Sequence, residues 1–333
     1  MNRLRFAQIG IGGMGAGHLH ALRARDDARL MAVCDSNMDL LMPFTEEQEA
    51  IATYTDWREV LKRDDLDAAI VVLPHHLYPE VVNAALERGL HVLKEKPLAM
   101  NLADGLSMFD TAERTGRTLM VAAQSKFYPS FSEACEFARS GVLGDLFLAR
   151  GSIIYRWASA FENRWRWRGI KAQSGGVAVI DSGWHLLDLM HWYLGPPVRV
   201  FCSLGSRQAI PEGQYDVDER AVLTLDYDTG CVASAVCCYI ALPNELKISL
   251  HGNTGNLVVD RDTLTTMLGD GTPMHHSLER VDPMAAQLEH FIACVKEGDP
   301  PLSSVQEAIH VQRMIEAAYR SAGTHQPVEL AEL

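Results

Sequence analysis

LRFAQIGIGGMG, residues 4–15, is the stretch of this sequence that decides the fold. A β-type run leads directly into a G-x-G-x-x-G pattern, and helical spacing follows it. In this context Gly10 permits a tight turn, Gly12 lets the backbone approach a pyrophosphate, and Gly15 lets a helix pack closely on the strand. Free N–H groups at the start of that helix then face the anion. The stretch predicts that a dinucleotide binds at Gly10, Ile11, Gly12, Gly13, Met14 and Gly15.

An acidic residue follows the next predicted strand at the spacing of a ribose-binding carboxylate. Asp35 comes directly after the β-type run 30–34 and lies 20 residues after Gly15. A carboxylate at this position hydrogen-bonds the adenosine ribose and repels a 2′-phosphate. Ser36 and Asn37 come next and provide no arginine for that phosphate. Asp35 and Ser36 are therefore predicted to bind NAD in preference to NADP, while FAD and S-adenosylmethionine share part of this signal.

The first third of the chain alternates short β-type runs with helical patterns, which is typical of βαβ units and a parallel sheet. Strands are expected at residues 5–10, 29–34, 68–73, 91–94 and 118–122, and helices at 18–25, 38–50, 57–63, 78–88 and 102–115. Right-handed crossovers would wind these elements into one α/β doubly wound sheet with helices on both faces. The predicted Rossmann domain covers residues 1–125.

Residues 126–333 have a different pattern and are predicted to form a second, α+β domain. Longer runs with near-alternating polarity occur at 146–155, 198–206, 219–226, 231–241 and 245–252. The short turns between them favour a large, mostly antiparallel sheet. Helices are expected at 179–193, 283–296 and 305–321, and the last helix and the tail are candidates for packing back on the first domain.

The composition argues against several functional classes. The 43 acidic residues outnumber the 30 basic ones, giving a net charge of −13, so nucleic acid is not an expected partner. No apolar window has the length of a membrane span, and the first residues lack the pattern of a signal peptide. The seven cysteines include no C-x-x-C pair, which favours buried thiols in a reducing compartment. A cytoplasmic protein without a membrane partner is expected.

Two further motifs, one in each predicted domain, carry a resemblance to a known family. Residues 84–98 read AALERGLHVLKEKPL, and residues 175–188 read GGVAVIDSGWHLLD, with Trp167 and Arg168 upstream. They resemble the "AL-x-x-G-x-x-V-x-x-EKP" and "GG-x-x-x-x-D-x-G-x-H-x-x-D" segments of the Gfo/Idh/MocA family, which includes glucose-fructose oxidoreductases and inositol dehydrogenases. The resemblance covers nearly the whole chain. It implies a nicotinamide cofactor, a small polyhydroxylated substrate, and an open-faced second sheet that forms a homodimer or homotetramer.

Two positions depart from the family pattern. The family often has "T-P-N-x-x-H" where this chain reads Leu73-Pro74-His75-His76-Leu77-Tyr78. Many members have asparagine or arginine before "F-x-P", where this chain has Gln124-Ser125-Lys126. Contacts of substrate and nicotinamide near these positions are expected to be atypical.

Hydride transfer from a carbinol carbon requires a base for the hydroxyl proton and donors that hold the oxygen. His185 is suited to this role because the unperturbed pKa of a histidine lies near neutrality. Asp181 lies one helical turn before it, so that the carboxylate can orient the imidazole. Lys96 follows a predicted parallel strand at its carboxyl end, where ligands of such sheets gather. It can donate a hydrogen bond to the substrate oxygen or, with a lowered pKa, act as the base. Lys96, Asp181 and His185 are the predicted catalytic residues. A helix N-cap for Asp181 and a core position for His185 are the structural alternatives.

The resemblance also implies contacts around these residues. The cofactor contacts that it adds are Pro74, His76, Glu95, Lys96, Gln124, Trp167 and Arg168. The substrate contacts beside Lys96, Asp181 and His185 are Lys126, Tyr155, Arg156, Trp165 and Trp184. Residues 155–168 interleave aromatic and basic side chains. We interpret them as a lid over the substrate, with packing between subunits as the alternative.

Other functions fit part of these residues. Asp181, His185 and Asp188 have i, i+4, i+7 spacing, but no second cluster completes a metal shell, so no metal is predicted. An NAD-retaining glycosidase or lyase, which oxidises a ring carbon transiently and then eliminates, would use the same residues. A non-catalytic nucleotide-sensing protein would keep the glycines and Asp35, but would need neither Lys96 nor His185.

Overall fold

The computed structural model describes residues 3–45, 51–156, 163–206 and 215–333, without the side chains of 163–165. The chain forms two compact units. The first contains Met1–Ala99, Ala103–Gln124 and Asp282–Ala308, and the second contains Met100–Leu102, Ser125–Val281 and Ile309–Leu333. Among the described residues, no helix combines the length and the apolar character that crossing a membrane requires.

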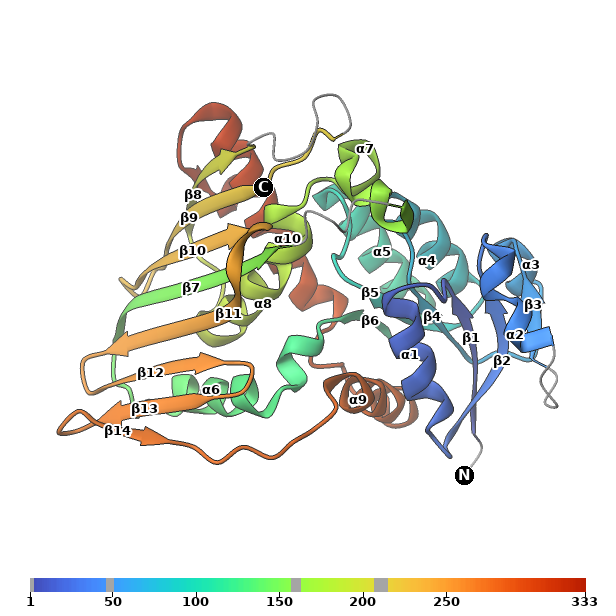
Figure 1. Cartoon of the computed structure of the whole chain (residues 1–333), viewed down its shortest axis with the longest axis horizontal. Coiled ribbons are helices and arrows are strands. Elements are labelled where there is room, and N and C mark those ends of the chain that lie inside the picture. Colours follow the sequence, from blue (N-terminus) through green and yellow to red (C-terminus); the bar gives the residue numbers. More distant parts are fainter. Residues whose placement is uncertain (1–2, 46–50, 157–162, 207–214) are drawn as a thin grey trace. The chain divides into compact units, whose positions relative to one another are not determined.

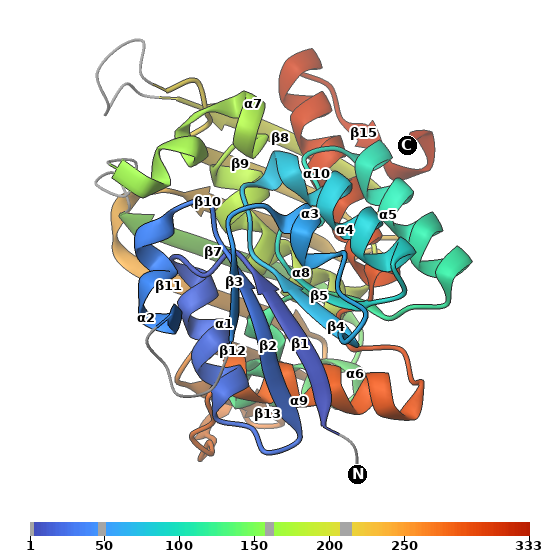
Figure 2. The same cartoon turned by 90° about the vertical axis from the view of Figure 1, so that its right-hand side faces the viewer.

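The first unit contains a six-stranded parallel sheet in the order β3-β2-β1-β4-β5-β6. Its strands are β1 Leu4–Ile9, β2 Ala28–Cys34, β3 Ala52–Tyr54, β4 Ala68–Val71, β5 His91–Glu95 and β6 Leu119–Ala122. The central strands are apolar on both faces because helices cover both sides (Figure 2), and every residue of β4 is fully buried. The predicted doubly wound parallel sheet is confirmed.

Helices from distant parts of the sequence cover this sheet. They are α1 Met14–Arg23, α2 Met42–Thr45, α3 Trp57–Val60, α4 Tyr78–Glu87, α5 Leu102–Thr115 and α9 Pro283–Glu297. Helix α9 packs on α1 so closely that a Cβ atom on Gly17 would lie 2.7 Å from Met284 Sδ. Phe291 of α9 also reaches Phe6 of β1, with ring centroids 6.3 Å apart. A segment far along the chain therefore completes the core of the first unit.

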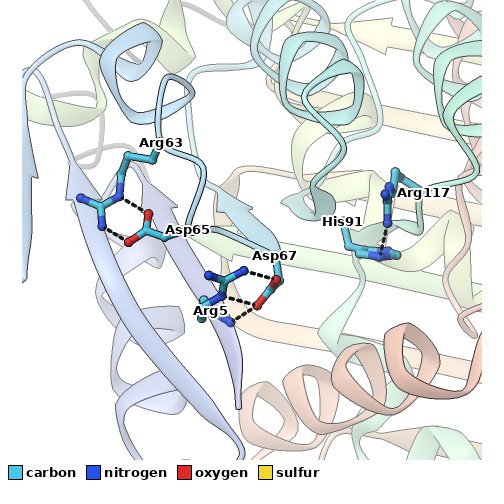
Figure 3. A network of polar contacts seen from close by, with 6 residues as sticks. All are labelled: Arg5, Arg63, Asp65, Asp67, His91 and Arg117. Atoms are coloured by element: carbon cyan, nitrogen blue, oxygen red, sulfur yellow. Dashed lines mark hydrogen bonds and ion pairs between the residues drawn. The ribbon is translucent and has the colours of Figure 1, made fainter. Parts of the chain in front are cut away.

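Polar contacts hold the amino-terminal edge of the parallel sheet (Figure 3). Arg5 in β1 binds Asp67, which precedes β4, through Nη2–Oδ1 and Nε–Oδ2 distances of 2.8 Å and 3.0 Å. The hydrogen bond from Arg5 lowers the pKa of Asp67. At the start of β5, His91 Nδ1 accepts a hydrogen bond from the backbone N–H of Thr118 at 3.1 Å. Burial, and then the charge of Arg117, lower the pKa of His91. This edge is structural and lies opposite to the carboxyl ends of the strands.

The second unit contains a nine-stranded sheet in the order β14-β13-β12-β11-β7-β10-β9-β8-β15. Its strands are β7 Leu146–Arg156, β8 Arg199–Gly205, β9 Arg220–Asp226, β10 Val232–Cys238, β11 Ile240–Gly252, β12 Gly255–Asp260, β13 Leu264–Leu268, β14 Thr272–His275 and β15 Val328–Glu329. Neighbours are antiparallel except β7 and β10, which run parallel. The prediction of a large, mostly antiparallel sheet is confirmed.

Three helices lie on one face of the nine-stranded sheet: α6 Pro129–Arg139, α8 Gly183–Leu194 and α10 Val305–Thr324 (Figure 1). Helix α8 lies directly on β7, because a Cβ atom on Gly151 would lie 2.6 Å from the Leu186 side chain. The opposite face carries apolar side chains that are 37% to 52% exposed, namely Leu148, Phe201, Val222 and Val232. All seven cysteines are free thiols, and all but Cys238 are buried.

Candidate active site

The loop between β1 and α1 requires glycine at two positions. Gly10 has a φ of +87°, and a Cβ atom there would lie 1.8 Å from the carbonyl oxygen of Val72. A Cβ atom on Gly15 would lie 2.3 Å from the carbonyl oxygen of Gly10. Gln8 Nε2 donates to the carbonyl oxygen of Gly15 at 2.6 Å and fixes the loop from below. The start of α1 is thereby held at the end of β1, as a pyrophosphate site requires.

Asp35 lies at the end of β2, beside this loop. Its Oδ2 accepts a hydrogen bond from the backbone N–H of Ile11 at 3.0 Å, and its Oδ1 accepts one from Asn37 at 3.0 Å. These bonds fix the carboxylate, while the neighbouring Ser36 is exposed. A helix start that favours anions and a fixed carboxylate are the donor and acceptor set that a dinucleotide needs. The residues present therefore fit NAD.

The end of β5 is connected to α1 by a buried polar contact. Glu95 Oε1 lies 3.0 Å from His18 Nε2, and both side chains are almost fully buried. Glu95 Oε2 accepts a hydrogen bond from the backbone N–H of Lys96 at 3.1 Å. Glu95 therefore links the helix of the glycine loop to the backbone of the predicted catalytic lysine. His18 is 1% exposed.

Lys94 is a fully buried lysine that sequence reasoning did not select. Its Nζ donates to the carbonyl oxygens of Leu98, at 2.7 Å, and of Pro97. It also lies 3.6 Å from the centroid of the Tyr78 ring. Burial lowers the pKa of Lys94 well below its usual value. The side chain anchors the turn that carries Lys96, and its one sequence signal is a lysine inside an apolar strand.

The remaining expected cofactor contacts of the first unit follow neighbouring strands. Pro74 and His76 come after β4, where His75 is buried and His76 is exposed. Gln124 comes after β6, and its buried Oε1 has no hydrogen-bond partner among the described residues. Carboxyl ends of parallel strands share one edge of a sheet. That edge therefore carries these residues together with the glycine loop, Asp35 and Lys96.

In the second unit, Asp181 forms a buried ion pair. It lies in a π-helical turn, Ala178–Ser182, that leads into α8. Arg168 Nη1 binds Asp181 Oδ2, with 12% and 2% of the two side chains exposed. Arg168 also lies over Trp167, with its Cζ 4.8 Å from the ring centroid. The ion pair fixes the position of the Asp181 carboxylate just before α8.

Asp218 fixes the turn that contains Asp181, and it was not predicted from the sequence. Its carboxylate accepts hydrogen bonds from the backbone N–H groups of Val177 at 3.0 Å and Val179 at 3.1 Å. Tyr319 donates its hydroxyl to the same carboxylate at 3.1 Å. The side-chain cap of this turn is therefore Asp218, which lies in the loop before β9. Nothing in the local sequence indicates this contact.

His185 differs from its neighbours on α8 by its exposure. Within residues 181–190, all of which are described, every residue except His185 is buried. Its Nδ1 lies 3.3 Å from Ser125 Oγ. A partly exposed imidazole with an oriented ring is suited to proton transfer.

Family models match both parts of the chain. Residues 4–123 match the NAD-binding Rossmann fold of the Gfo/Idh/MocA oxidoreductases, and residues 138–330 match the C-terminal alpha/beta domain of the same family. This chain belongs to the Gfo/Idh/MocA family. It is an NAD(P)-dependent oxidoreductase that acts on CH–OH groups.

Relatives of this family member span almost its full length. The D-xylose 1-dehydrogenase (NADP(+)) 2 of Haloferax volcanii is 29% identical, over 93% of this chain and 91% of the relative. The D-glucoside 3-dehydrogenase of Escherichia coli is 26% identical, over 98% of this chain and 97% of the relative. The crystal structure of an oxidoreductase domain protein from Kribbella flavida has a TM-score of 0.90 at 25% identity, covering 99% of this chain and 100% of that one.

Other residues that the family resemblance selected have varied surroundings. Lys126 is buried, and its Nζ lies 2.8 Å from Asp188 Oδ1. Asp188, which has metal-ligand spacing with Asp181 and His185, is therefore paired with a lysine. No group of three or more His, Cys, Asp or Glu residues is placed to hold a metal ion among the described residues. Trp184 is 1% exposed and lies in the core.

The stretch interpreted as a substrate lid is described only in part. Tyr155 is half-buried and Arg156 exposed at the end of β7. Residues 157–162 and the side chain of Trp165 lie outside the described residues.

Proposed function

We propose that this family member is an NAD-preferring dehydrogenase that reversibly oxidises a secondary hydroxyl group of a sugar, cyclitol or glycoside. The observation that supports it most is the edge of the parallel sheet in the first unit. There the glycine loop, Asp35 and the turn of Lys96 occur together, and Glu95 connects the helix of the loop to that turn. A merely structural sheet edge needs neither a fixed carboxylate at the end of β2 nor a lysine after a buried glutamate.

Each predicted catalytic residue has one role in the proposed chemistry. His185, oriented by Ser125, accepts the proton of the substrate hydroxyl group. Asp181 pairs with Arg168, and a carboxylate near the imidazole favours its protonated form. Lys96 donates a hydrogen bond to the oxygen as it becomes a carbonyl oxygen. Bound NAD supplies the acceptor for the hydride.

The preference for NAD rests on Asp35. A 2′-phosphate would bring negative charge toward a carboxylate that two backbone N–H groups hold in place. The neighbouring Ser36 has no charge to compensate it. The name of the Haloferax volcanii relative includes NADP, so cofactor preference differs within the family.

We also propose that the chain forms a homodimer or homotetramer through the face of the nine-stranded sheet that bears Leu148, Phe201, Val222 and Val232. Apolar side chains gathered on one face favour burial against a partner. A second copy presents the same face, as symmetric oligomers require.

The seven free thiols suit a reducing cytoplasm.

The test is to incubate the protein with NAD or NADP and a panel of inositols, free sugars and glycosides. NADH absorbance and organic products are recorded together. NADH rising in step with a ketone product, faster than NADPH from NADP, is the expected result. Cleaved glycoside without net NADH would instead assign the NAD-retaining glycosidase or lyase activity, and no product from any substrate would contradict both.

Two lysine variants complete the test. Lys96→Ala should lower turnover by at least about a hundredfold while NAD binding is retained. Lys62→Ala is the matched control, because Lys62 is an exposed lysine of the same unit that binds Glu59. Equal turnover of the two variants would remove Lys96 from the mechanism.

A further inference from the structure

A polar hollow in the second unit is lined largely by residues that the steps above do not use. Its volume is about 450 Å³, which is within the range of small-molecule sites. It lies where β7 ends, β11 begins and β12 turns into β13. Its polar lining includes Tyr155, Asn244, Glu245, Lys247, Arg261 and Asp262.

Arg261 lines this hollow and lies close to two tyrosine rings. Its Cζ lies 5.5 Å from the centroid of the Tyr155 ring and 6.0 Å from that of the Tyr128 ring. Its Nη2 also donates to the hydroxyl group of Tyr155. A guanidinium with two aromatic neighbours is restricted in its rotamers and keeps further N–H donors for a ligand.

The backbone holds Arg261 in place. The N–H group of Asp260 donates to the carbonyl oxygen of Thr263 at 3.0 Å, which closes a tight turn between β12 and β13. Asp260 Oδ1 accepts hydrogen bonds from the N–H groups of Asp262 and Thr263 at 3.0 Å and 2.8 Å. Ser130 donates to the carbonyl oxygen of Arg261 at 2.9 Å. The turn therefore presents the arginine in a fixed direction, as a binding site requires.

The segment after β6 connects the hollow to a residue that contacts His185 in the same unit. Ser125, which contacts His185, is three residues before Tyr128, which lies under Arg261. Tyr155 of the lining follows Ile154 of β7, which pairs with Cys238 of β10. The next residue, Tyr239, has a pKa raised by burial and then by the charge of Asp181. The hollow is therefore connected to His185 through Tyr128 and Ser125, and its lining residue Tyr155 is one of the predicted substrate contacts.

The charges of the lining indicate the class of ligand. Three carboxylates, from Glu245, Asp260 and Asp262, outnumber the two cations, Lys247 and Arg261. Phosphate or carboxylate groups are disfavoured, because the hollow is negative overall. A neutral ring rich in hydroxyl groups matches the mixture of donors, acceptors and an aromatic face.

We propose that this hollow is a second saccharide subsite, in which Arg261 recognises a neutral sugar ring linked to the ring that is oxidised. The proposal rests on the proposed function and narrows its substrate class to glycosides. Arg261 is then a specificity-determining residue that distinguishes a disaccharide from a monosaccharide.

Calorimetric titration of the NADH-loaded protein with glucose, maltose, cellobiose and the anionic maltobionate tests the subsite without turnover. At least one neutral disaccharide should bind at least about tenfold more tightly than glucose, since the added ring brings hydrogen bonds to a charged group. Maltobionate should bind more weakly than maltose. Disaccharides that bind no better than glucose, or tighter binding of maltobionate, would overturn the proposal.

Arg261→Ala should remove most of the advantage of the disaccharide while changing glucose binding less than about twofold. Arg58→Ala is the matched control, because Arg58 is an exposed arginine over the ring of Trp57, at 4.3 Å, in the first unit. Equal losses for both sugars in Arg261→Ala would contradict the role of Arg261. If disaccharides bind as expected but no sugar, cyclitol or glycoside yields NADH, the subsite stands and the oxidation proposal fails.

Discussion

Replacing Lys94 by methionine tests whether the buried amine fixes the turn that carries Lys96. Methionine has a similar length and lacks only the hydrogen-bonding head group. The carbonyl oxygens of Pro97 and Leu98, both in buried residues, then lose their donor. The contact between Nζ and the Tyr78 ring is lost as well.

The magnitude follows from these contacts. Each buried carbonyl left without a donor costs about 1–3 kcal/mol, and the contact with the ring contributes about 1 kcal/mol. Part of this loss of stability is offset, because methionine avoids the cost of burying an amine. That cost is seen in the pKa of Lys94, which burial lowers. A net loss of about 2 kcal/mol is expected, which lowers the midpoint of thermal unfolding by roughly 4–8 °C.

Calorimetry measures the unfolding midpoint, and steady-state kinetics measures the effect on the turn. We expect kcat to fall about tenfold, because a displaced Lys96 no longer meets the substrate oxygen well. The affinity for NAD should be retained, since Asp35 and the glycine loop are untouched. Lys62→Met is the control at an exposed lysine. An unchanged midpoint together with an unchanged kcat would refute the assigned role of Lys94.

Three further results are expected. Asp35→Ala should raise the Kd for NAD about tenfold in a fluorescence titration and lower the ratio of the Kd for NADP to the Kd for NAD. An unchanged ratio would remove the assigned role of Asp35. Because the pKa of His91 is lowered in the folded state, the unfolded chain binds the proton first, so stability is highest above about pH 6.5 and falls as the pH drops below it. Between pH 7.5 and 5, the free energy of unfolding of His91→Gln, measured with denaturant, should decrease less than that of the unmodified protein. An equal decrease would assign the pH dependence to another group. Val232→Glu should reduce the mass measured by light scattering, whereas an unchanged oligomer would show that another surface holds it together.

The parallel sheet could be predicted because its strands are buried on both faces and therefore read as continuous apolar runs. The exception is β3, which has only three residues. In the second unit, β12, β13, β14 and β15 were not predicted. All residues of β14 are exposed, so it lacks the buried alternation that indicates a strand. Helix α6 was also missed, since it begins directly after the segment that was considered only for its ligand contacts.

In the candidate site, features set by local sequence could be predicted, and contacts between residues far apart in the sequence could not. The glycine loop and Asp35 were predictable because their spacing along the chain is fixed by one βαβ unit. The partners of Asp181 and Lys126 were not, because tertiary packing brings Arg168 and Asp188 to them. Arg261 lies in a turn that carries no motif, and only the fold places it beside two tyrosines.

The buried contact between His18 and Glu95 has a consequence for the order of events in turnover. His18 lies one turn into the helix that begins at the glycine loop, and Glu95 holds the backbone of Lys96. A dinucleotide bound at the loop would contact the start of the helix that carries His18, and His18 is connected through Glu95 to the backbone of Lys96. We therefore expect ordered kinetics, in which the cofactor binds before the substrate and dissociates after the product.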